Sequence, residues 1–257
     1  MTVTLPEAQR ATKKLAGKVA LVTGGSRGIG AGIALRLAKE GADVAISYAK
    51  NKSLAEEVVA KLKNEDVHAA AFQADVTSGE QSQNLVNDVI KEFGKIDILI
   101  NNAGVFELQP LENVTLDHYQ RVFDVNVKGV IGNTIAALKN ISDGGRIINI
   151  SSVAATTSAP NFSVYAATKA AINALTRIWA QELGARKITV NAVAPGATAS
   201  DMYEAVPDEV KKELVAKTAL GRVGQPEDIA AVVAFLASDD GGWITGETIV
   251  AHGGITV

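Results

Sequence analysis

The chain has 257 residues, of which 47% are hydrophobic and 21% are charged, and its net charge is -3. This composition is that of a globular protein with a large core, and it excludes a disordered, fibrous or disulfide-stapled chain. The absence of cysteine excludes thiolate nucleophiles and sulfur-ligated metals. The three histidines, His68, His118 and His252, lack metal-ligand spacing, so no metal site is predicted. The charge balance gives no sign of a surface for nucleic acid.

The first 14 residues are polar and lack the apolar core of a signal peptide, so we expect an N-terminal arm (residues 1–14) ahead of one domain (residues 15–257). The longest stretch without charge, residues 147–168, is rich in Ser and Thr and is not expected to span a membrane. We therefore expect a cytoplasmic protein with no membrane partner.

Apolar runs of strand length alternate with helical patterns along the chain, as they do in βαβ units. In chain order, the predicted strands are 18–23, 43–48, 67–74, 96–101, 146–151, 188–194 and 248–251, and the predicted helices are 29–40, 52–64, 79–93, 115–138, 163–183 and 226–237. Asn161 and Ser163 are expected to begin the fifth helix, and Gln225 and Pro226 the sixth. The strands are nearly continuous runs of Val, Ile, Leu and Ala, which is typical of buried parallel strands. The sequence predicts an α/β fold, a single doubly wound Rossmann domain with a seven-stranded parallel sheet and helices on both faces.

Residues 196–220 interrupt this alternation. The segment begins with Gly196 after Pro195 and is amphipathic in its second half. In a doubly wound sheet, a segment in this position lies beyond the carboxyl ends of the strands, where ligands bind. We predict that it forms a mobile lid over a substrate.

A glycine-rich turn follows the first predicted strand and leads into a helix. Its glycines, Gly24, Gly28 and Gly30, permit a tight turn, a close approach of the backbone to a pyrophosphate, and close packing of the helix on the sheet. The spacing differs from the usual dinucleotide fingerprint, and a turn without a ligand is the alternative. The strand before the turn and the helix after it favour a dinucleotide site.

Residues at the end of the second strand determine whether such a site prefers NAD or NADP. A site for NAD places an acid there to bind the ribose hydroxyls, but the only acid of this strand, Asp43, is at its other end. Arg27 in the glycine turn and Lys50 after the strand are suited to a 2′-phosphate. The sequence therefore predicts a preference for NADP(H), with NAD(H) as the alternative.

Several motifs, in this order along the chain, resemble those of the short-chain dehydrogenase/reductase family between residues 15 and 254. They are TGGSRGIG at 23–30, Asp75-Val76, Asn101-Asn102-Ala103-Gly104, Asn126, Ser151-Ser152, Tyr165 with Lys169, Pro195-Gly196 and Gly253-Gly254. Ala251-His252 departs from the family, which usually has Val-Asp there, so different hydrogen bonding is expected in that segment.

Tyr165 and Lys169 are four residues apart on one predicted helix, so their side chains share a face. An ammonium group near a phenol favours the phenolate and lowers the pKa of the tyrosine toward working pH. The resemblance implies that Tyr165 is the general acid/base of carbonyl reduction and that Ser152 hydrogen-bonds the substrate oxygen. It also implies that Lys169 lowers the pKa of Tyr165 and holds the nicotinamide ribose, and that Asn126 supports a water for proton exchange. The alternatives are a strand-end cap for Ser152 and a helix-kink residue for Asn126.

The resemblance implies further contacts with the cofactor and the substrate. Besides the glycines, Arg27, Lys50, Tyr165 and Lys169, the expected cofactor-binding residues are Ser26, Ile29, Tyr48, Asp75, Val76, Asn102, Ala103, Gly104, Pro195, Gly196, Thr198 and Ser200. The expected substrate pocket is small and apolar, with Val153, Ala154, Phe162, Met202 and Tyr203, and Phe106 is expected in its wall.

Within the family, the sequence is most similar to the ketoreductase branch that includes 3-oxoacyl-acyl-carrier-protein reductases. Few cations are available to receive an acidic carrier protein, with Arg121, Lys128 and Arg177 as the candidates. We predict an NADPH-dependent reductase of neutral ketones that works reversibly on the secondary alcohol. The resemblance implies that it assembles as a homotetramer. The alternatives are a carrier-protein reductase and an NADP-binding sensor without catalysis. An epimerase or dehydratase would need a larger C-terminal domain.

Overall fold

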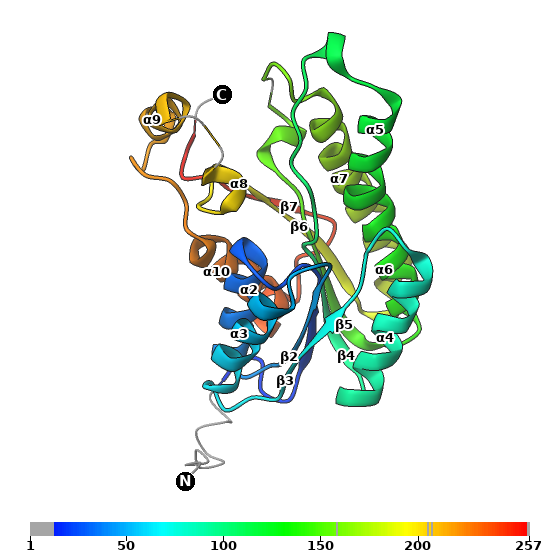
Figure 1. Cartoon of the computed structure of the whole chain (residues 1–257). Helices are drawn as coiled ribbons and strands as arrows, with labels where there is room; N and C mark the ends of the chain where they lie inside the picture. Colours follow the sequence, from blue (N-terminus) through cyan, green and yellow to red (C-terminus); the bar gives the residue numbers. More distant parts are fainter. Residues whose placement is uncertain (1–12, 158, 205, 207, 256–257) are drawn as a thin grey trace.

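Seven parallel strands form one sheet in the order β3-β2-β1-β4-β5-β6-β7 (Figure 1). The computed structural model describes residues 13–157, 159–204, 206 and 208–255. The strands are β1 (Val19–Val22), β2 (Asp43–Tyr48), β3 (Ala69–Gln73), β4 (Ile96–Asn101), β5 (Ile141–Ile150), β6 (Thr189–Pro195) and β7 (Thr248–Ala251). The predicted sheet is confirmed, and its strand order reverses between β1 and β4, where doubly wound sheets bind ligands.

Helices cover both faces of the sheet, as predicted (Figure 1). One face carries α2 (Gly28–Lys39), α3 (Lys52–Lys63) and α10 (Pro226–Ala237), and the other carries α4 (Gly79–Phe93), α6 (Gly129–Leu138) and α7 (Ser163–Leu183). Helix α5 (Leu116–Phe123) packs against α7. The helices α8 (Asp201–Glu204) and α9 (Asp208–Lys217) lie beyond the strand ends. Short 3-10 turns lie at Leu111–Asn113 (η1), Val153–Ala155 (η3), Gly184–Arg186 (η4) and Asp239–Gly241 (η5).

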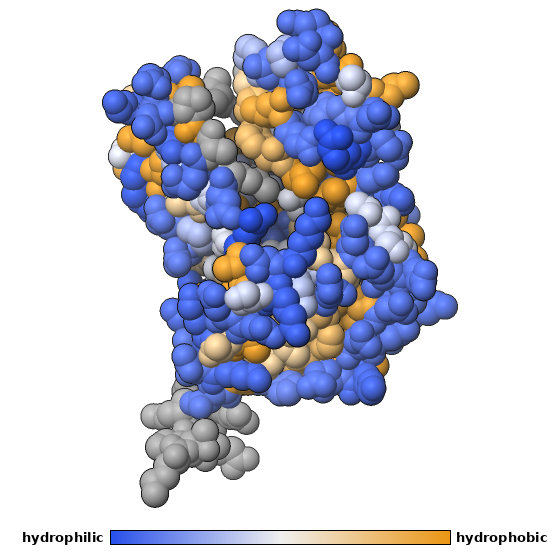
Figure 2. Space-filling view, in the orientation of Figure 1, coloured by the Kyte–Doolittle hydropathy of each residue, from blue (hydrophilic) through white to orange (hydrophobic). Residues whose placement is uncertain are grey.

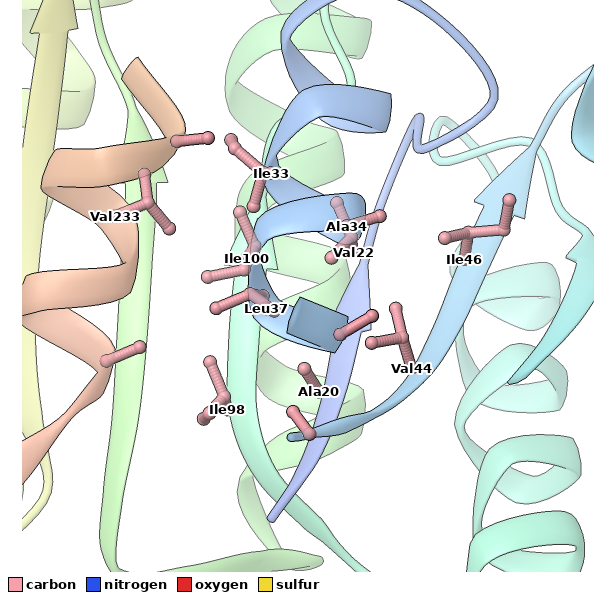
Figure 3. Close-up of a cluster of buried hydrophobic side chains, with 14 of the residues drawn as sticks. Ala20, Val22, Ile33, Ala34, Leu37, Val44, Ile46, Ile98, Ile100 and Val233 are labelled. Carbon is pink, nitrogen blue, oxygen red and sulfur yellow. The ribbon is translucent and has the colours of Figure 1, made fainter. Parts of the chain in front are cut away.

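The buried side chains of the central strands divide between two hydrophobic layers. On β4, Ile98 and Ile100 face the α2 layer, whereas Leu99 faces the α4 layer. Figure 3 shows Ile33 of α2 and Val233 of α10 directed toward the same part of the sheet. Each such side chain contributes about 2 kcal/mol when it is fully removed from water. The sheet is therefore a rigid base for residues at its edge.

Glycine allows α2 and α10 to approach each other closely. A β carbon on Gly32 of α2 would lie only 2.7 Å from the Cβ of Pro226, the first residue of α10. Because α10 begins there, its entry is also fixed by Asp228, whose carboxylate accepts a hydrogen bond from the backbone of Gln225 at 2.7 Å. The predicted start of this helix is confirmed.

One predicted helix, the start of one predicted strand and one predicted helix cap differ in the structure, although the helix at 163–183 has the predicted range. The helix predicted at 115–138 is divided into α5 and α6 by a π-helical turn at Asp124–Lys128 (η2). Strand β5 begins five residues before the predicted 146, because Ile141 pairs with Ile96 ahead of an irregularity in the ladder. The fifth predicted helix, α7, has no side-chain cap from Asn161 or Ser163; Phe162 is its N-cap residue, and Asn161 has a positive φ of 72°.

The segment 196–220 contains the two short helices α8 and α9. In the space-filling view, the molecule is hollowed between these helices and the α5 side, beyond the carboxyl ends of the strands (Figure 2). Most of the predicted N-terminal arm, residues 1–12, lies outside the described residues. None of the helices in the described part of the chain has the length and apolar character needed to cross a bilayer.

Candidate active site

The predicted site residues gather at the edge where the parallel strands end. Thr23 follows β1, Asn102 follows β4, Ser152 comes shortly after β5, and Gly196 follows β6. Because these four strands are neighbours in the sheet, residues far apart in the sequence meet at one edge. The backbone amides of Asn102 and Ala103 both donate to Oγ1 of Thr23, at 3.0 and 3.1 Å, which joins two of these turns.

Tyr165 and Ser152 form the centre of the site. Tyr165 lies in the first turn of α7, and its hydroxyl shares a hydrogen bond with the Ser152 side chain. Ser152 also caps the η3 turn, since its Oγ accepts a hydrogen bond from the amide of Ala154 at 3.1 Å. Lys169, one turn further along α7, is 6% exposed and donates to the carbonyl of Ile150 at 2.9 Å. Its Nζ lies 5.7 Å from the centre of the Tyr165 ring.

Burial controls the proton affinities of these groups. It raises the pKa of Tyr165, and the hydrogen bond with Ser152 opposes this rise only in part. The pKa of Tyr165 is therefore raised and not lowered as predicted, because burial outweighs the hydrogen bond with Ser152. Burial also lowers the pKa of Lys169 to about 8. Both groups therefore hold their protons at neutral pH.

Asn126 lies in the π-helical turn between α5 and α6, where its side chain makes three hydrogen bonds within the fold. Its Oδ1 accepts from the amide of Val105 at 2.8 Å, and its Nδ2 donates to the Val105 carbonyl at 2.9 Å and to Oγ1 of Thr168 at 3.2 Å. Thr168 in turn donates to the carbonyl of Tyr165 at 2.6 Å. A π-turn of this kind is frequent at functional sites. Here it links the segment after β4 to the first turn of α7.

The glycine-rich turn has one packed side and one open side. A β carbon on Gly30 would lie 2.4 Å from both Nδ2 of Asn102 and the carbonyl oxygen of Gly24, so no larger residue fits. Gly28 has a positive φ of 53°, and a β carbon there would meet only Ser200, at 3.6 Å. Asn102 also donates to the carbonyl of Gly24 at 3.1 Å, so its side chain shapes the turn.

The start of α2 fits the phosphates of a dinucleotide. Arg27 is the N-cap residue and provides no side-chain cap, so the first backbone amides of α2 are free to bind an anion. The Arg27 guanidinium is exposed and pairs with Asp201 of α8, with Nη1 and Oδ2 2.7 Å apart. Lys50 is exposed after β2, while Asp43 lies at the opposite end of that strand and accepts from the amide of His68 at 2.7 Å.

Other predicted cofactor residues contribute mainly to the fold. The side chains of Tyr48, Val76 and Pro195 are buried, Ile29 packs against the core, and Ser26 is partly buried. Asp75 is exposed and accepts two hydrogen bonds from Thr77, while Gly104 lies close to Asn126 and Lys169. Thr198 donates to the carbonyl of Gly196 at 3.0 Å, and Ser200 to that of Thr198 at 3.2 Å. The backbones of these residues lie together at the edge of the sheet, but few of their side chains are free to contact a cofactor.

Aromatic rings surround Tyr165 on the side of the predicted substrate pocket. The centre of the Phe106 ring lies 4.9 Å from that of Tyr165 at an interplanar angle of 89°, and Phe162 lies 6.4 Å from Tyr165. Among the other predicted pocket residues, Ala154 is buried, Val153 and Tyr203 are partly buried, and the Met202 side chain lies outside the described structure. Tyr165 is thus lined by aromatic rings on this side, while Ser152 and Lys169 are its polar neighbours.

The three histidines lie apart and have separate roles. Nε2 of His68 is 2.8 Å from a carboxylate oxygen of Glu92, and Nδ1 of His252 accepts from the amide of Gly254 at 3.0 Å. His118 is 5% exposed, and neither ring nitrogen has a hydrogen-bond partner. No group of three or more His, Asp or Glu side chains suited to a metal occurs among the described residues.

Two contacts of the site were not predicted from the sequence. Thr168 joins Asn126 to Tyr165, and Glu107 pairs with Arg121 beside the aromatic rings. Neither contact follows from a local motif, because each joins residues from different elements. Thr168 does lie inside the Tyr165-to-Lys169 interval, so a hydroxyl one turn from the tyrosine was the available signal.

The chain is similar to known proteins along nearly its whole length. A family model described as Enoyl-(Acyl carrier protein) reductase matches residues 24–256. An uncharacterized oxidoreductase of Methylorubrum extorquens is 50% identical over 94% of this chain and 99% of its own. A hydroxynaphthalene reductase-like protein of Metarhizium brunneum is 42% identical over 97% and 99% of the two chains. A 3-oxoacyl-[acyl-carrier-protein] reductase of Staphylococcus aureus is 44% identical over 93% and 98%.

Solved structures show the same fold. A blue fluorescent protein from a metagenomic library, in complex with NADPH, has a TM-score of 0.90 and 43% identity over 95% of this chain and all of its own. A short-chain dehydrogenase from Burkholderia cenocepacia, in complex with NADP, has a TM-score of 0.90 and 42% identity over 94% and 98%. The chain belongs to the short-chain dehydrogenase/reductase family of oxidoreductases.

Proposed function

We propose that the chain is an NADPH-dependent carbonyl reductase that converts neutral ketones and secondary alcohols into each other. The observation that carries this proposal is the hydrogen-bonded pair of Tyr165 and Ser152 in apolar surroundings, with Lys169 on the next turn of the same helix. A neutral phenol beside a second hydroxyl is suited to bind a carbonyl oxygen and to donate a proton to it.

Each residue of this group has a separate task in the reaction. When bound, the nicotinamide supplies the hydride. Tyr165 donates its hydroxyl proton to the carbonyl oxygen, and Ser152 hydrogen-bonds that oxygen and fixes its place. Lys169 would hold the nicotinamide ribose, and its ammonium stabilises the phenolate that remains when Tyr165 gives up its proton. Asn126 supports the water that returns a proton to the site.

The glycine turn and the start of α2 would hold the phosphates of the cofactor. A preference for NADP(H) is supported by two exposed cations near this turn, Arg27 and Lys50, and by the position of Asp43 at the far end of β2. Two structural neighbours carry NADPH or NADP, which agrees with this choice. The side chain of Tyr48 is 7% exposed, so only its backbone is available at this end of β2.

The substrate is a neutral, apolar ketone. Support comes from the rings of Phe106 and Phe162 next to Tyr165 and from the small side chain of Ala154 after β5. Arg121 pairs with Glu107, the residue after Phe106, so its charge is partly neutralised. A relative described as hydroxynaphthalene reductase-like favours an aromatic substrate of this kind.

A carrier-bound 3-oxoacyl thioester is the second candidate substrate, favoured by the relative in Staphylococcus aureus. An acidic carrier protein needs cations at the mouth of the site. Of the three candidates, Arg121 pairs with Glu107, and Lys128 lies 3.8 Å from a carboxylate oxygen of Asp124. Two of these cations are therefore partly neutralised, which favours the free ketone.

The test is turnover with NADPH or NADH on a panel of ketones, aldehydes, β-keto esters and acyl thioesters. Replacing Tyr165→Phe is expected to abolish turnover while NADPH binding stays within about twofold, since only the proton donor is removed. Tyr119→Phe on α5 is the matched control and should retain wild-type rates. Turnover by Tyr165→Phe would refute the mechanism. If the wild-type chain binds NADPH but turns over no substrate, the alternative of an NADP-binding sensor without catalysis is favoured.

A further inference from the structure

The segment after β4 is anchored on both sides of Phe106. On one side, Val105 exchanges two backbone hydrogen bonds with the Asn126 side chain, at 2.8 and 2.9 Å. On the other side, the Glu107 carboxylate accepts from Nε and Nη2 of Arg121, with distances of 3.0 and 2.6 Å. Phe106 stands between these two anchors. Its backbone is therefore fixed from both neighbours.

The Glu107–Arg121 pair has the geometry of a positioning contact. The guanidinium engages both carboxylate oxygens, a fork that fixes direction as well as distance. It lowers the pKa of Glu107, chiefly through the hydrogen bond from Arg121. Behind the carboxylate, Nε2 of the buried His118 lies 4.0 Å from Oε2. Exposed ion pairs add little to the free energy of unfolding. We therefore expect the Glu107–Arg121 pair to matter because it fixes the position of the segment after β4.

The pair holds a ring that packs against the ring of Tyr165. Phe106 meets Tyr165 edge to face at 4.9 Å and also meets Phe162, at 5.7 Å and 67°. Aromatic rings prefer such edge and offset contacts with one another. A substrate whose carbonyl oxygen reaches Tyr165 and Ser152 therefore places its substituent beside the Phe106 ring.

We propose that Glu107 and Arg121 are positioning residues that hold Phe106 as an aromatic wall beside Tyr165, and that this wall selects ketones bearing an aromatic ring. The inference rests on the proposed reductase activity and names its substrate class. A loosened segment after β4 loses the wall but leaves Tyr165, Ser152 and Lys169 in place. Aromatic ketones then bind more weakly, while a small aliphatic ketone, which needs no wall, is unaffected.

The test compares acetophenone with 2-butanone in steady-state reduction by NADPH. In Glu107→Gln and in Arg121→Gln, KM for acetophenone should rise about three- to tenfold, the size of one lost aromatic contact, with kcat within about twofold. KM for 2-butanone and the Kd of NADPH should not change. Arg121→Lys keeps the charge but loses the fork, so it should fall between wild type and Arg121→Gln. Phe106→Leu should lose the selectivity directly.

The matched control is Asp143→Asn, which removes the negative charge of another surface carboxylate–arginine pair, the one with Arg186 at 2.8 Å near the start of β5. It should behave as wild type with both ketones. An unchanged ratio of KM values in Glu107→Gln and Phe106→Leu would overturn this inference alone. Equal losses of kcat with both ketones would also overturn it, since they indicate general damage. Failure of the wild-type chain to reduce either ketone would overturn the proposed function and this inference with it.

Discussion

Burial favours the neutral forms of both Tyr165 and Lys169, but the consequences for their protons differ. The tyrosine, with its pKa raised, keeps its proton throughout the neutral range. The lysine, with its pKa lowered to about 8, loses its proton just above that range. In reduction, the proton donor therefore remains available as pH rises, and the ammonium is lost first.

The lowered pKa of Lys169 determines how ketone reduction should depend on pH. In ketone reduction, kcat/KM should fall as pH rises above about 8, because the ammonium that stabilises the phenolate is lost. Lys169→Met should lower kcat/KM about a hundredfold and show no such fall. Lys91→Met, on the exposed side of α4, is the control and should reproduce the wild-type profile. A wild-type profile that stays flat to pH 10 would contradict this assignment.

Arg27 has two competing partners, the Asp201 carboxylate and the proposed 2′-phosphate of the cofactor. Arg27→Ala should weaken NADPH binding at least about tenfold, as expected for a lost charged hydrogen bond, and leave NADH binding unchanged. Asp201→Asn should tighten NADPH binding about twofold to fivefold, because an exposed ion pair is weak and no longer needs to break. Fluorescence titration with both nucleotides measures these changes. Equal changes in the binding of NADPH and NADH would show that Arg27 does not bind the 2′-phosphate.

At the scale of elements, the start of α10 depends on one carboxylate. Arg222 donates to both oxygens of Asp228, at 2.6 and 2.9 Å, and the amide of Gln225 donates to one of them. These contacts lower the pKa of Asp228 from 3.8 to about 2, with Arg222 as the largest cause. The charged form is therefore bound more strongly in the folded chain than in the unfolded one.

Asp228→Asn should lower the free energy of unfolding by about 1 kcal/mol at pH 7, a value reduced for the solvent exposure of this side chain. Since the folded pKa lies below the unfolded one, the stabilisation is present above pH 3.8 and disappears as pH falls toward 2. Urea unfolding of both proteins at several pH values measures the difference. Glu57→Gln on α3 is the control. A difference that grows at low pH would contradict the sign.

The elements that bury apolar side chains were predictable, and the contacts between elements were not. Strands such as β4 are read from their continuous apolar residues, because parallel strands are covered on both faces. The π-turn at Asn126 changes backbone hydrogen bonding without changing the helical apolar pattern, so the sequence carries no sign of it. The pKa of Tyr165 depends on how deeply α7 buries it, and the pairs of Arg27 with Asp201 and of Glu107 with Arg121 depend on how loops are placed.

Among the described residues, large apolar side chains are exposed at several places, and two of these places are suited to contacts with other copies of the chain. On the helices beside the site, Ile135 of α6 is 67% exposed and Ile178 of α7 is 58% exposed. Around the end of α10, Phe235 is 43% exposed and Trp243 is fully exposed. Exposed apolar groups in such number mark surfaces that associate with other chains. Two separate surfaces on each copy are what a tetramer with two-fold axes requires.

We therefore predict a homotetramer of about four times the 26.7 kDa chain mass, measured by light scattering after size exclusion. Ile178→Asp places a charge on the helical surface and should leave a dimer held by the other surface, because an unpaired charge is costly to bury. Trp243→Asp should likewise leave a dimer through the helical surface, and the double variant should be monomeric. Val210→Asp, on the exposed side of α9, is the matched control and should keep the wild-type mass. A wild-type chain of 26.7 kDa in solution would refute the assembly.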